Sequence, residues 1–170
     1  AIDVATGRQI WRTPVVLEPE TRGSSFTRGA ATIYEGKLFR VTRDNHLLAL
    51  DMETGEEIWN QRFAEKAEGY YATGAPIIAN GVLISGMSGG ESTTRGFLDG
   101  WDPDTGQKLW RRHTIPAPGE PGSETWPVDG DGWRYGGGPT WRSGSYDPEL
   151  DLVYWGTGNA EPYDPKPRGE

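Results

Sequence analysis

A nine-residue pattern, Asp-x-x-Thr-Gly-x-x-aliphatic-Trp, occurs three times and constrains the fold of this chain more than any other feature. The copies occupy residues 3–11, 51–59 and 102–110, so 48 residues separate the first two tryptophans and 51 separate the last two. Repeats of about fifty residues with strand-like content are typical of β-propellers, in which each repeat forms one blade.

Each residue type in the pattern has a physical reason to be there. The aspartate opens a turn by accepting hydrogen bonds from nearby backbone N–H groups. The glycine supplies the positive φ that a tight connection between strands needs. The aliphatic residue and the tryptophan begin the returning strand, and a large flat indole suits packing between neighbouring sheets. We therefore expect Trp11, Trp59 and Trp110 to be structural.

Short predicted strands fill the intervals between the repeats. They fall into three sets, at 30–34, 37–42, 46–51 and 57–63, then 75–79, 82–87, 96–101 and 107–114, then 139–146 and 152–157. Asn80-Gly81 is a strong hairpin signal within the second set. The best helical candidate, 61–69, is short, and the proline- and glycine-rich stretch 116–138 predicts an elaborated loop.

These signals predict an all-β fold: a β-propeller fragment with about two complete four-stranded blades and parts of two more. Residues 1–170 are expected to be part of a single propeller domain. Because roughly four to eight blades are needed to close a propeller, we expect the segment to belong to a longer chain or a larger assembly.

Composition excludes several classes of function. Lys and Arg number 17 against 25 Asp and Glu, a net charge of −8, which disfavours nucleic acid as a partner. The absence of cysteine excludes disulfides, thiolate metal sites and cysteine nucleophiles within the segment. No apolar run approaches the ~20 residues of a membrane span.

One glycine-rich segment, Ser-Gly-Met-Ser-Gly-Gly-Glu at 85–91, follows a predicted strand. Such a loop lets backbone N–H groups approach an anionic ligand closely, and Glu91 at its end is a candidate metal or ligand carboxylate. The alternative is a solvated turn in which Glu91 pairs with Arg95. The same segment matches the nucleophile elbow of serine hydrolases, but that motif needs a helix directly after Ser88, and the residues that follow do not favour one.

Two later stretches carry further candidates. Residues 136–141 place Trp141 after three consecutive glycines, and residues 146–159 lead to Asn159 in a glycine-containing turn. Asn159 is also an ordinary turn residue and Trp141 is also an ordinary packing residue, so spacing alone leaves both roles open. The two histidines, His46 and His113, lack metal-ligand spacing.

Taken together, these residues resemble the methanol/ethanol dehydrogenase family of quinoproteins over essentially the whole chain. The motifs that carry the resemblance are the three Trp repeats, Thr73-Gly74-Ala75-Pro76, Ser88-Gly89-Gly90-Glu91-x-x-x-Arg95-Gly96, Trp126 with Gly130-Asp131-Gly132-Trp133, Gly136-Gly137-Gly138-x-x-Trp141, and Tyr146-Asp147-Pro148 leading to Gly156-Thr157-Gly158-Asn159. The resemblance implies an eight-bladed propeller that binds pyrroloquinoline quinone (PQQ) and a Ca²⁺ or lanthanide ion.

The resemblance also implies roles for individual residues. Glu91 and Asn159 match the family's metal ligands, and a carboxylate with an amide oxygen suits a hard cation. Trp141 matches the indole beneath the quinone ring. Positions that hold the quinone match Arg28, Thr73, Ser88, Gly89, Gly90 and Glu91, with Thr140 standing beside the place where the family has a threonine and this chain has Pro139. An arginine at position 28 suits this role because PQQ carries three carboxylates, and a guanidinium pairs bidentately with a carboxylate.

The chain departs from the family in a second respect besides Pro139, and part of the family's machinery is expected to lie outside it. The family's vicinal cysteines fall at Arg22 and Gly23, so no disulfide covers the quinone here. The family's catalytic aspartate lies a few dozen residues beyond Asn159, so no catalytic residue is expected in this segment, and the 170 residues alone are expected to be inactive.

The resemblance predicts part of a periplasmic alcohol dehydrogenase that oxidises a small primary alcohol to an aldehyde. Its partners would be the alcohol, a cytochrome c-type electron acceptor and the rest of the propeller chain. The alternative from another class is a non-catalytic propeller that scaffolds other proteins. In a scaffold Glu91 and Asn159 need not converge, whereas in the enzyme they must face one ion beside Trp141.

Overall fold

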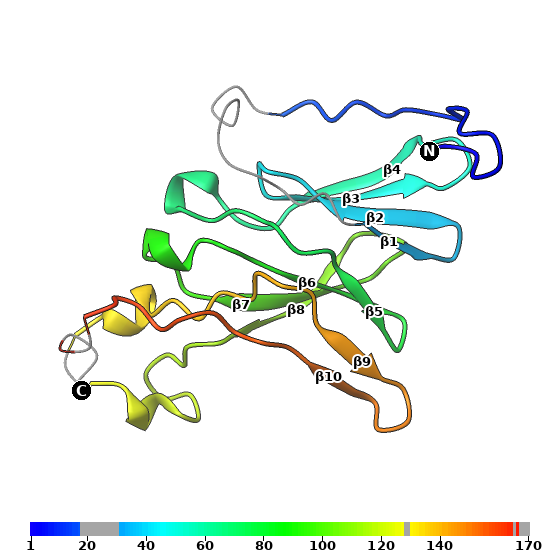
Figure 1. Ribbon diagram of the computed structural model, residues 1–170. Coiled ribbons are helices and arrows are strands. Elements are labelled where there is room, and N and C mark those ends of the chain that lie inside the picture. Colours follow the sequence, from blue (N-terminus) through cyan, green and yellow to red (C-terminus); the bar gives the residue numbers. More distant parts are fainter. Residues whose placement is uncertain (18–30, 128–129, 165, 167–170) are drawn as a thin grey trace.

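The chain forms two four-stranded antiparallel sheets and one further hairpin, in a computed structural model that describes residues 1–17, 31–127, 130–164 and 166 (Figure 1). The first sheet contains β1 (Ala31–Tyr34), β2 (Lys37–Val41), β3 (His46–Asp51) and β4 (Glu57–Arg62). The second contains β5 (Ile77–Ala79), β6 (Val82–Gly86), β7 (Phe97–Trp101) and β8 (Lys108–His113). The hairpin consists of β9 (Ser145–Asp147) and β10 (Leu152–Tyr154).

Both sheets are simple meanders, in which each strand pairs with the next one along the chain. The connection between β5 and β6 is the Asn-Gly turn that the sequence predicts, with φ of 45° at Asn80 and 78° at Gly81. The predicted all-β class and the two complete four-stranded units are therefore confirmed.

The third set of strands begins later than the sequence predicts. Residues 139–144 do not pair as a strand; they run beside residues 73–75 instead, where Thr73 Oγ1 donates to Trp141 O (2.8 Å) and Ser143 Oγ donates to Ala75 O (2.8 Å). The strand starts only at Ser145, after this contact with the preceding unit ends.

Successive units are arranged side by side, with their first strands as neighbours. Strand β5 contacts β1 on one side and β9 on the other. The Thr32 hydroxyl in β1 donates to the carbonyl of Pro76, which directly precedes β5. Figure 1 shows the units following one another in chain order, from cyan through green to orange. Near the N-terminus, an isolated bridge between Ile2 and Gln9 closes the turn of a further partial unit.

The repeated aspartate organises its turn as expected. Asp51 Oδ1 accepts backbone hydrogen bonds from Glu53 (2.9 Å) and Thr54 (2.8 Å). Asp102 Oδ1 does the same for Asp104 (2.9 Å) and Thr105 (2.8 Å). These short bonds lower the pKa of both carboxyls, so the aspartates stay charged and the turns keep their shape.

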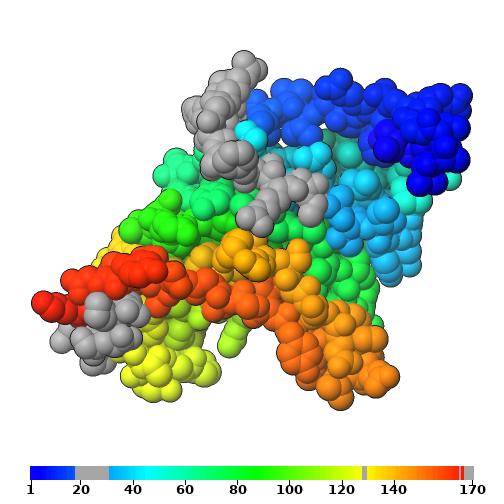
Figure 2. Space-filling view, viewed as in Figure 1, coloured from blue at the N-terminus to red at the C-terminus, as the bar shows by residue number. Residues whose placement is uncertain are grey.

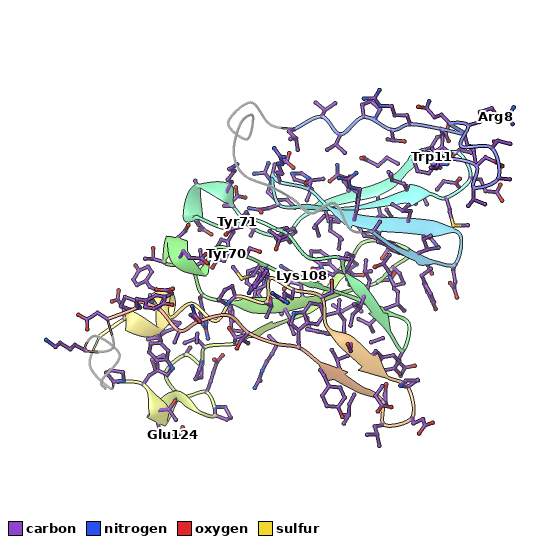
Figure 3. The ribbon with its side chains drawn as sticks, in the orientation of Figure 1. Arg8, Trp11, Tyr70, Tyr71, Lys108 and Glu124 are labelled. Atoms are coloured by element: carbon purple, nitrogen blue, oxygen red, sulfur yellow. The ribbon has the colours of Figure 1, made fainter. Side chains whose placement is uncertain are left out.

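The first two repeated tryptophans each pack on the turn of the next repeat, whereas Trp110 is 39 % exposed. Trp11 Nε1 donates to Met52 O (3.0 Å), and Trp59 Nε1 donates to Pro103 O (3.1 Å). A Cβ atom built on Gly106 would lie only 2.7 Å from Cδ2 of Trp59, so the indole occupies the space that a side chain would need. Figure 3 shows Trp11 against the β3–β4 turn. The structural role of Trp11 and Trp59 is confirmed: they join one unit to the next.

The buried core lies within and between the two complete sheets, and it includes Phe39, Trp59, Phe97 and Trp101. Outside the strands, the described residues form only short 3-10 turns. These are η2 (Lys66–Glu68), η3 (Gly90–Ser92), η4 (Ser123–Thr125) and η5 (Gly132–Tyr135). In the part of the chain that the structure describes, no helix is long and apolar enough to cross a membrane.

Candidate metal and cofactor site

Three segments that are far apart in the sequence lie side by side next to the candidate ligands. Residues 94–96 form a parallel bridge with residues 136–138, which form an antiparallel bridge with residues 159–161. The backbone hydrogen bonds are Gly96 N–H to Gly137 O (2.8 Å), Gly137 N–H to Thr94 O (3.0 Å), Gly138 N–H to Asn159 O (2.9 Å) and Glu161 N–H to Gly136 O (2.9 Å). We call this three-segment ladder the glycine ladder. Figures 1 and 2 show the orange-to-red segment that follows β10 running beside the amber segment that precedes β9.

One proline ring packs against both glycines that precede the candidate metal ligands. A Cβ atom built on Gly90 would lie 2.8 Å from Cδ of Pro139, and one built on Gly158 would lie 2.8 Å from Cγ of the same ring. Gly90 and Gly158 directly precede Glu91 and Asn159. Glu91 and Asn159 therefore each stand one residue from a glycine that packs on Pro139, although 68 positions separate them in the sequence.

Glu91 lies in η3, in a turn whose left-handed residues at each end are Gly89 (φ 113°) and Thr93 (φ 61°). Its side chain is exposed. Tyr71 approaches it, with the Tyr71 hydroxyl 3.5 Å from Oε2 of Glu91. Tyr71 is held there because its backbone pairs with Ser88 in both directions, at 3.2 and 2.7 Å. Burial raises the pKa of Tyr71, and the negative charge of Glu91 adds to that rise, so Tyr71 remains a hydrogen-bond donor.

Asn159 presents its side-chain oxygen at the surface. Its amide nitrogen donates to the Tyr163 hydroxyl (3.1 Å), while its backbone oxygen is taken by Gly138. Among the described residues, the side-chain oxygen accepts no hydrogen bond. The tyrosine contact thus fixes which end of the amide is free, and the free end is the one that ligates a hard cation.

Three of the expected cofactor residues form one hydrogen-bonded cluster. The Thr73 and Ser88 hydroxyls lie 2.8 Å apart, and Thr73 also donates to the backbone oxygen of Trp141 (2.8 Å). Ser88 is buried, whereas Thr73 and Trp141 are half-buried. The Arg142 guanidinium carbon lies 4.4 Å from the centre of the Trp141 ring, which adds a positive charge beside this indole.

Thr140 is placed differently from these residues. Its side chain is 1 % exposed, its hydroxyl donates to Phe97 O (2.5 Å), and the same hydroxyl accepts from Met87 N–H (3.0 Å). The hydroxyl is therefore engaged inside the second sheet, where it fixes the backbone directly before Trp141. Arg28 lies outside the described residues.

The structure also bears on the alternatives. Arg95 does not pair with Glu91; its Nη2 lies 3.0 Å from Oε2 of Glu120. Ser88 is followed by a three-residue 3-10 turn rather than the helix that a nucleophile elbow requires, and its hydroxyl bonds to Thr73. The surface ion pair and the hydrolase alternative are thus not supported.

The donor set fits a hard cation and a planar anionic ligand. Within the described ranges, no group of three or more His, Cys, Asp or Glu side chains could hold a metal. A carboxylate and an amide oxygen are the ligands that Ca²⁺ and similar hard ions take. Trp141 is half-buried, and its backbone oxygen is bonded to the Thr73 hydroxyl, which pairs with Ser88; an aromatic ring with polar neighbours suits a planar ligand.

Known proteins are similar to this chain in sequence and in fold. A family model described as "Glucose/ethanol/alcohol dehydrogenase, beta-propeller domain" matches residues 1–164. Quinohemoprotein alcohol dehydrogenase ADH IIB of Pseudomonas putida is 40 % identical over 179 residues, covering 96 % of this chain and 25 % of that protein. Lanthanide-dependent methanol dehydrogenase of Methylacidiphilum fumariolicum (strain SolV) is 38 % identical over 142 residues, covering 73 % of this chain and 23 % of that protein. The solved structure of a europium-containing methanol dehydrogenase matches with a TM-score of 0.83 at 32 % identity, covering 94 % of this chain and 31 % of that chain. The chain spans about a quarter to a third of the length of these relatives.

Proposed function

Because the chain belongs to the glucose/ethanol/alcohol dehydrogenase β-propeller family of quinoproteins, we propose that it supplies part of the cofactor and metal site of a PQQ-dependent alcohol dehydrogenase. The observation that supports this proposal is that Gly90 and Gly158, which directly precede Glu91 and Asn159, both pack on the ring of Pro139, two residues before Trp141. The full reaction we propose is the oxidation of a primary alcohol to an aldehyde in the periplasm, with electrons passed to a cytochrome-type acceptor.

Residues of this chain would hold both the metal ion and PQQ. The Glu91 carboxylate and the free oxygen of Asn159 would ligate the ion, Ca²⁺ or a lanthanide. Trp141 would carry the quinone ring on its half-buried indole, and Thr73 and Ser88 would face the edge of the ring. Thr140 would support Trp141 from inside the sheet. When bound, PQQ supplies a carbonyl that accepts two electrons and a proton as hydride, and the ion polarises that carbonyl.

In this proposal, the chain holds the ion and the quinone in position and keeps water away from them. The glycine ladder fixes the two ligand-bearing turns through backbone hydrogen bonds, so little reorganisation is needed when an ion binds. The buried Ser88, which pairs with the half-buried Thr73, and the buried Pro139 would shield the inner side of the site. The base that takes the alcohol proton would come from outside these 170 residues.

The scaffold alternative explains less. A scaffold needs the propeller framework and the Trp repeats, but it gives no reason for the turns of Glu91 and Asn159 to pack on one proline ring. This packing supports the enzyme.

Metal and cofactor binding test the proposal directly. In the full-length protein that carries this segment, we expect Tb³⁺ and PQQ to bind together, with Tb³⁺ luminescence as the readout. Glu91→Gln and Asn159→Ala should each weaken Tb³⁺ binding at least about tenfold because each removes one ligand. Glu149→Gln, an exposed change in the β9–β10 turn, is the matched control and should leave it unchanged. Equal Tb³⁺ affinity in wild type and in both ligand variants would refute the proposal.

A further inference from the structure

We propose that Arg95 is a positioning residue for the metal site, which sets the separation of Glu91 and Asn159 by joining the glycine ladder to Ile115, Glu120 and Trp133. This inference rests on the proposed function. Arg95 is four residues beyond Glu91, yet its ion pair is with Glu120 and not with Glu91.

The Arg95 side chain makes three separate contacts, all to the long connection after β8. Its Nε donates to Ile115 O (2.7 Å), and its Nη2 donates to Glu120 Oε2 (3.0 Å). Its guanidinium carbon lies 4.8 Å from the centre of the Trp133 ring. The side chain is only 12 % exposed. One planar group thus holds the start, the middle and the end of this connection.

The Arg95 backbone belongs to the glycine ladder. Arg95 forms the parallel bridge with Gly137, and Gly137 forms the antiparallel bridge with Ala160, next to Asn159. The Tyr70 hydroxyl donates to Arg95 O (3.4 Å). The residue therefore links the turn of Glu91, the segment of Asn159 and the connection after β8 at one point.

The contact with Glu120 is itself held in place. Glu120 Oε2 also accepts from the backbone N–H of Ala117 (2.7 Å). This backbone bond and the positive charge of Arg95 lower the pKa of Glu120, so the carboxylate is charged at neutral pH. Because a guanidinium has donors in a fixed planar fork, lysine cannot reach Ile115, Glu120 and Trp133 in the same geometry.

Arg134 provides a matched control on the same indole. Its guanidinium carbon lies 4.7 Å from the Trp133 ring, about as near as that of Arg95. Among the described residues its side chain makes no hydrogen bond, and its backbone is outside the glycine ladder. Replacing Arg134 therefore removes a cation beside Trp133 but leaves the hydrogen bonds of Arg95 to Ile115 and Glu120 in place.

The experiment uses the full-length protein with PQQ and measures Tb³⁺ affinity, the number of waters bound to Tb³⁺ and thermal stability. Luminescence lifetimes in H₂O and D₂O give the number of waters. We expect Arg95→Gln to weaken Tb³⁺ binding about tenfold and to add about one bound water, because a ligand drifts out of range. Arg95→Lys should fall between Arg95→Gln and wild type, and Arg134→Gln should stay within about twofold of wild type. Should Arg95→Gln fail to fold, Glu120→Gln removes the ion pair alone and should weaken binding in the same direction.

A lower melting temperature with unchanged Tb³⁺ affinity and water number would overturn the positioning role, since it would show that Arg95 only stabilises the fold. Absence of Tb³⁺ binding in wild type would overturn the proposed function, and the inference with it. Binding in wild type that is equal in all Arg95 and Glu120 variants would overturn the inference alone.

Discussion

Gly106→Ala should destabilise the protein far more than the same change at Gly81, because only Gly106 lies beneath a tryptophan of the neighbouring unit. Both glycines have positive φ, 71° and 78°, so both changes carry a similar backbone cost of about 1–2 kcal/mol. At Gly81 nothing lies within 4 Å of the new methyl group, whereas at Gly106 it would meet Trp59 at 2.7 Å.

The difference between the two variants isolates the contact between units. Trp59 is 8 % exposed and its Nε1 is bonded to Pro103, so the indole has little room to move. Forcing a methyl group into such a contact costs about 1–3 kcal/mol in addition to the backbone cost. Guanidinium unfolding, followed by circular dichroism, should therefore show Gly106→Ala to be less stable than Gly81→Ala by that amount. Equal losses in the two variants would refute the account of the Trp repeat as a lock between units.

Three further predictions follow from the described contacts. Arg111→Met should lower the free energy of unfolding, measured by denaturant titration, by about 3–5 kcal/mol, because the fully buried Asp99 carboxylate loses its partner at 2.6 Å. Adding Asp99→Asn to this variant should recover part of the lost stability. A double variant that is no more stable than Arg111→Met would contradict this reasoning. Burial, and then nearby arginines, lower the pKa of His113 from 6.5 to about 4. The unfolded chain therefore binds the extra proton first, so stability should fall as pH drops from about 6.5 to about 4, and His113→Gln should flatten that slope in pH-dependent melting curves. Tyr71→Phe should weaken Tb³⁺ binding only about threefold, since the tyrosine touches Glu91 weakly at 3.5 Å, and a loss as large as that in Glu91→Gln would contradict a supporting role.

Much of the fold was predictable because the blade framework is built from local signals. The Asp-x-x-Thr-Gly turns and the Asn80-Gly81 hairpin each specify their own backbone geometry, and alternating strands follow from them. The start of β9 was not predictable in this way. Residues 139–144 look like a strand, but their hydrogen bonds go to the preceding unit, through Thr73 and Ser143.

The candidate residues of the site came from the family resemblance, whereas the backbone architecture around them could not be predicted from the sequence. Family resemblance pointed to Glu91, Asn159 and Trp141, while the triple glycine read only as part of a loop. The structure shows that this glycine segment is the middle segment of the ladder, and it pairs with segments 42 and 23 residues away, which no local pattern encodes. The contacts of Arg95 were missed for the same reason, since its position suggested Glu91 as the partner.

The most direct test of the account is where a lanthanide ion sits in the full-length protein with PQQ bound. Anomalous diffraction at the absorption edge of the lanthanide locates the ion independently of any model of the side chains. We predict one peak about 2.3–2.6 Å from both the Glu91 carboxylate and the Asn159 side-chain oxygen, with the Trp141 ring stacked on the quinone. A peak elsewhere, or one bound by Glu91 while Asn159 points into solvent, would contradict the claim that the glycine ladder brings these two residues together to hold a metal ion.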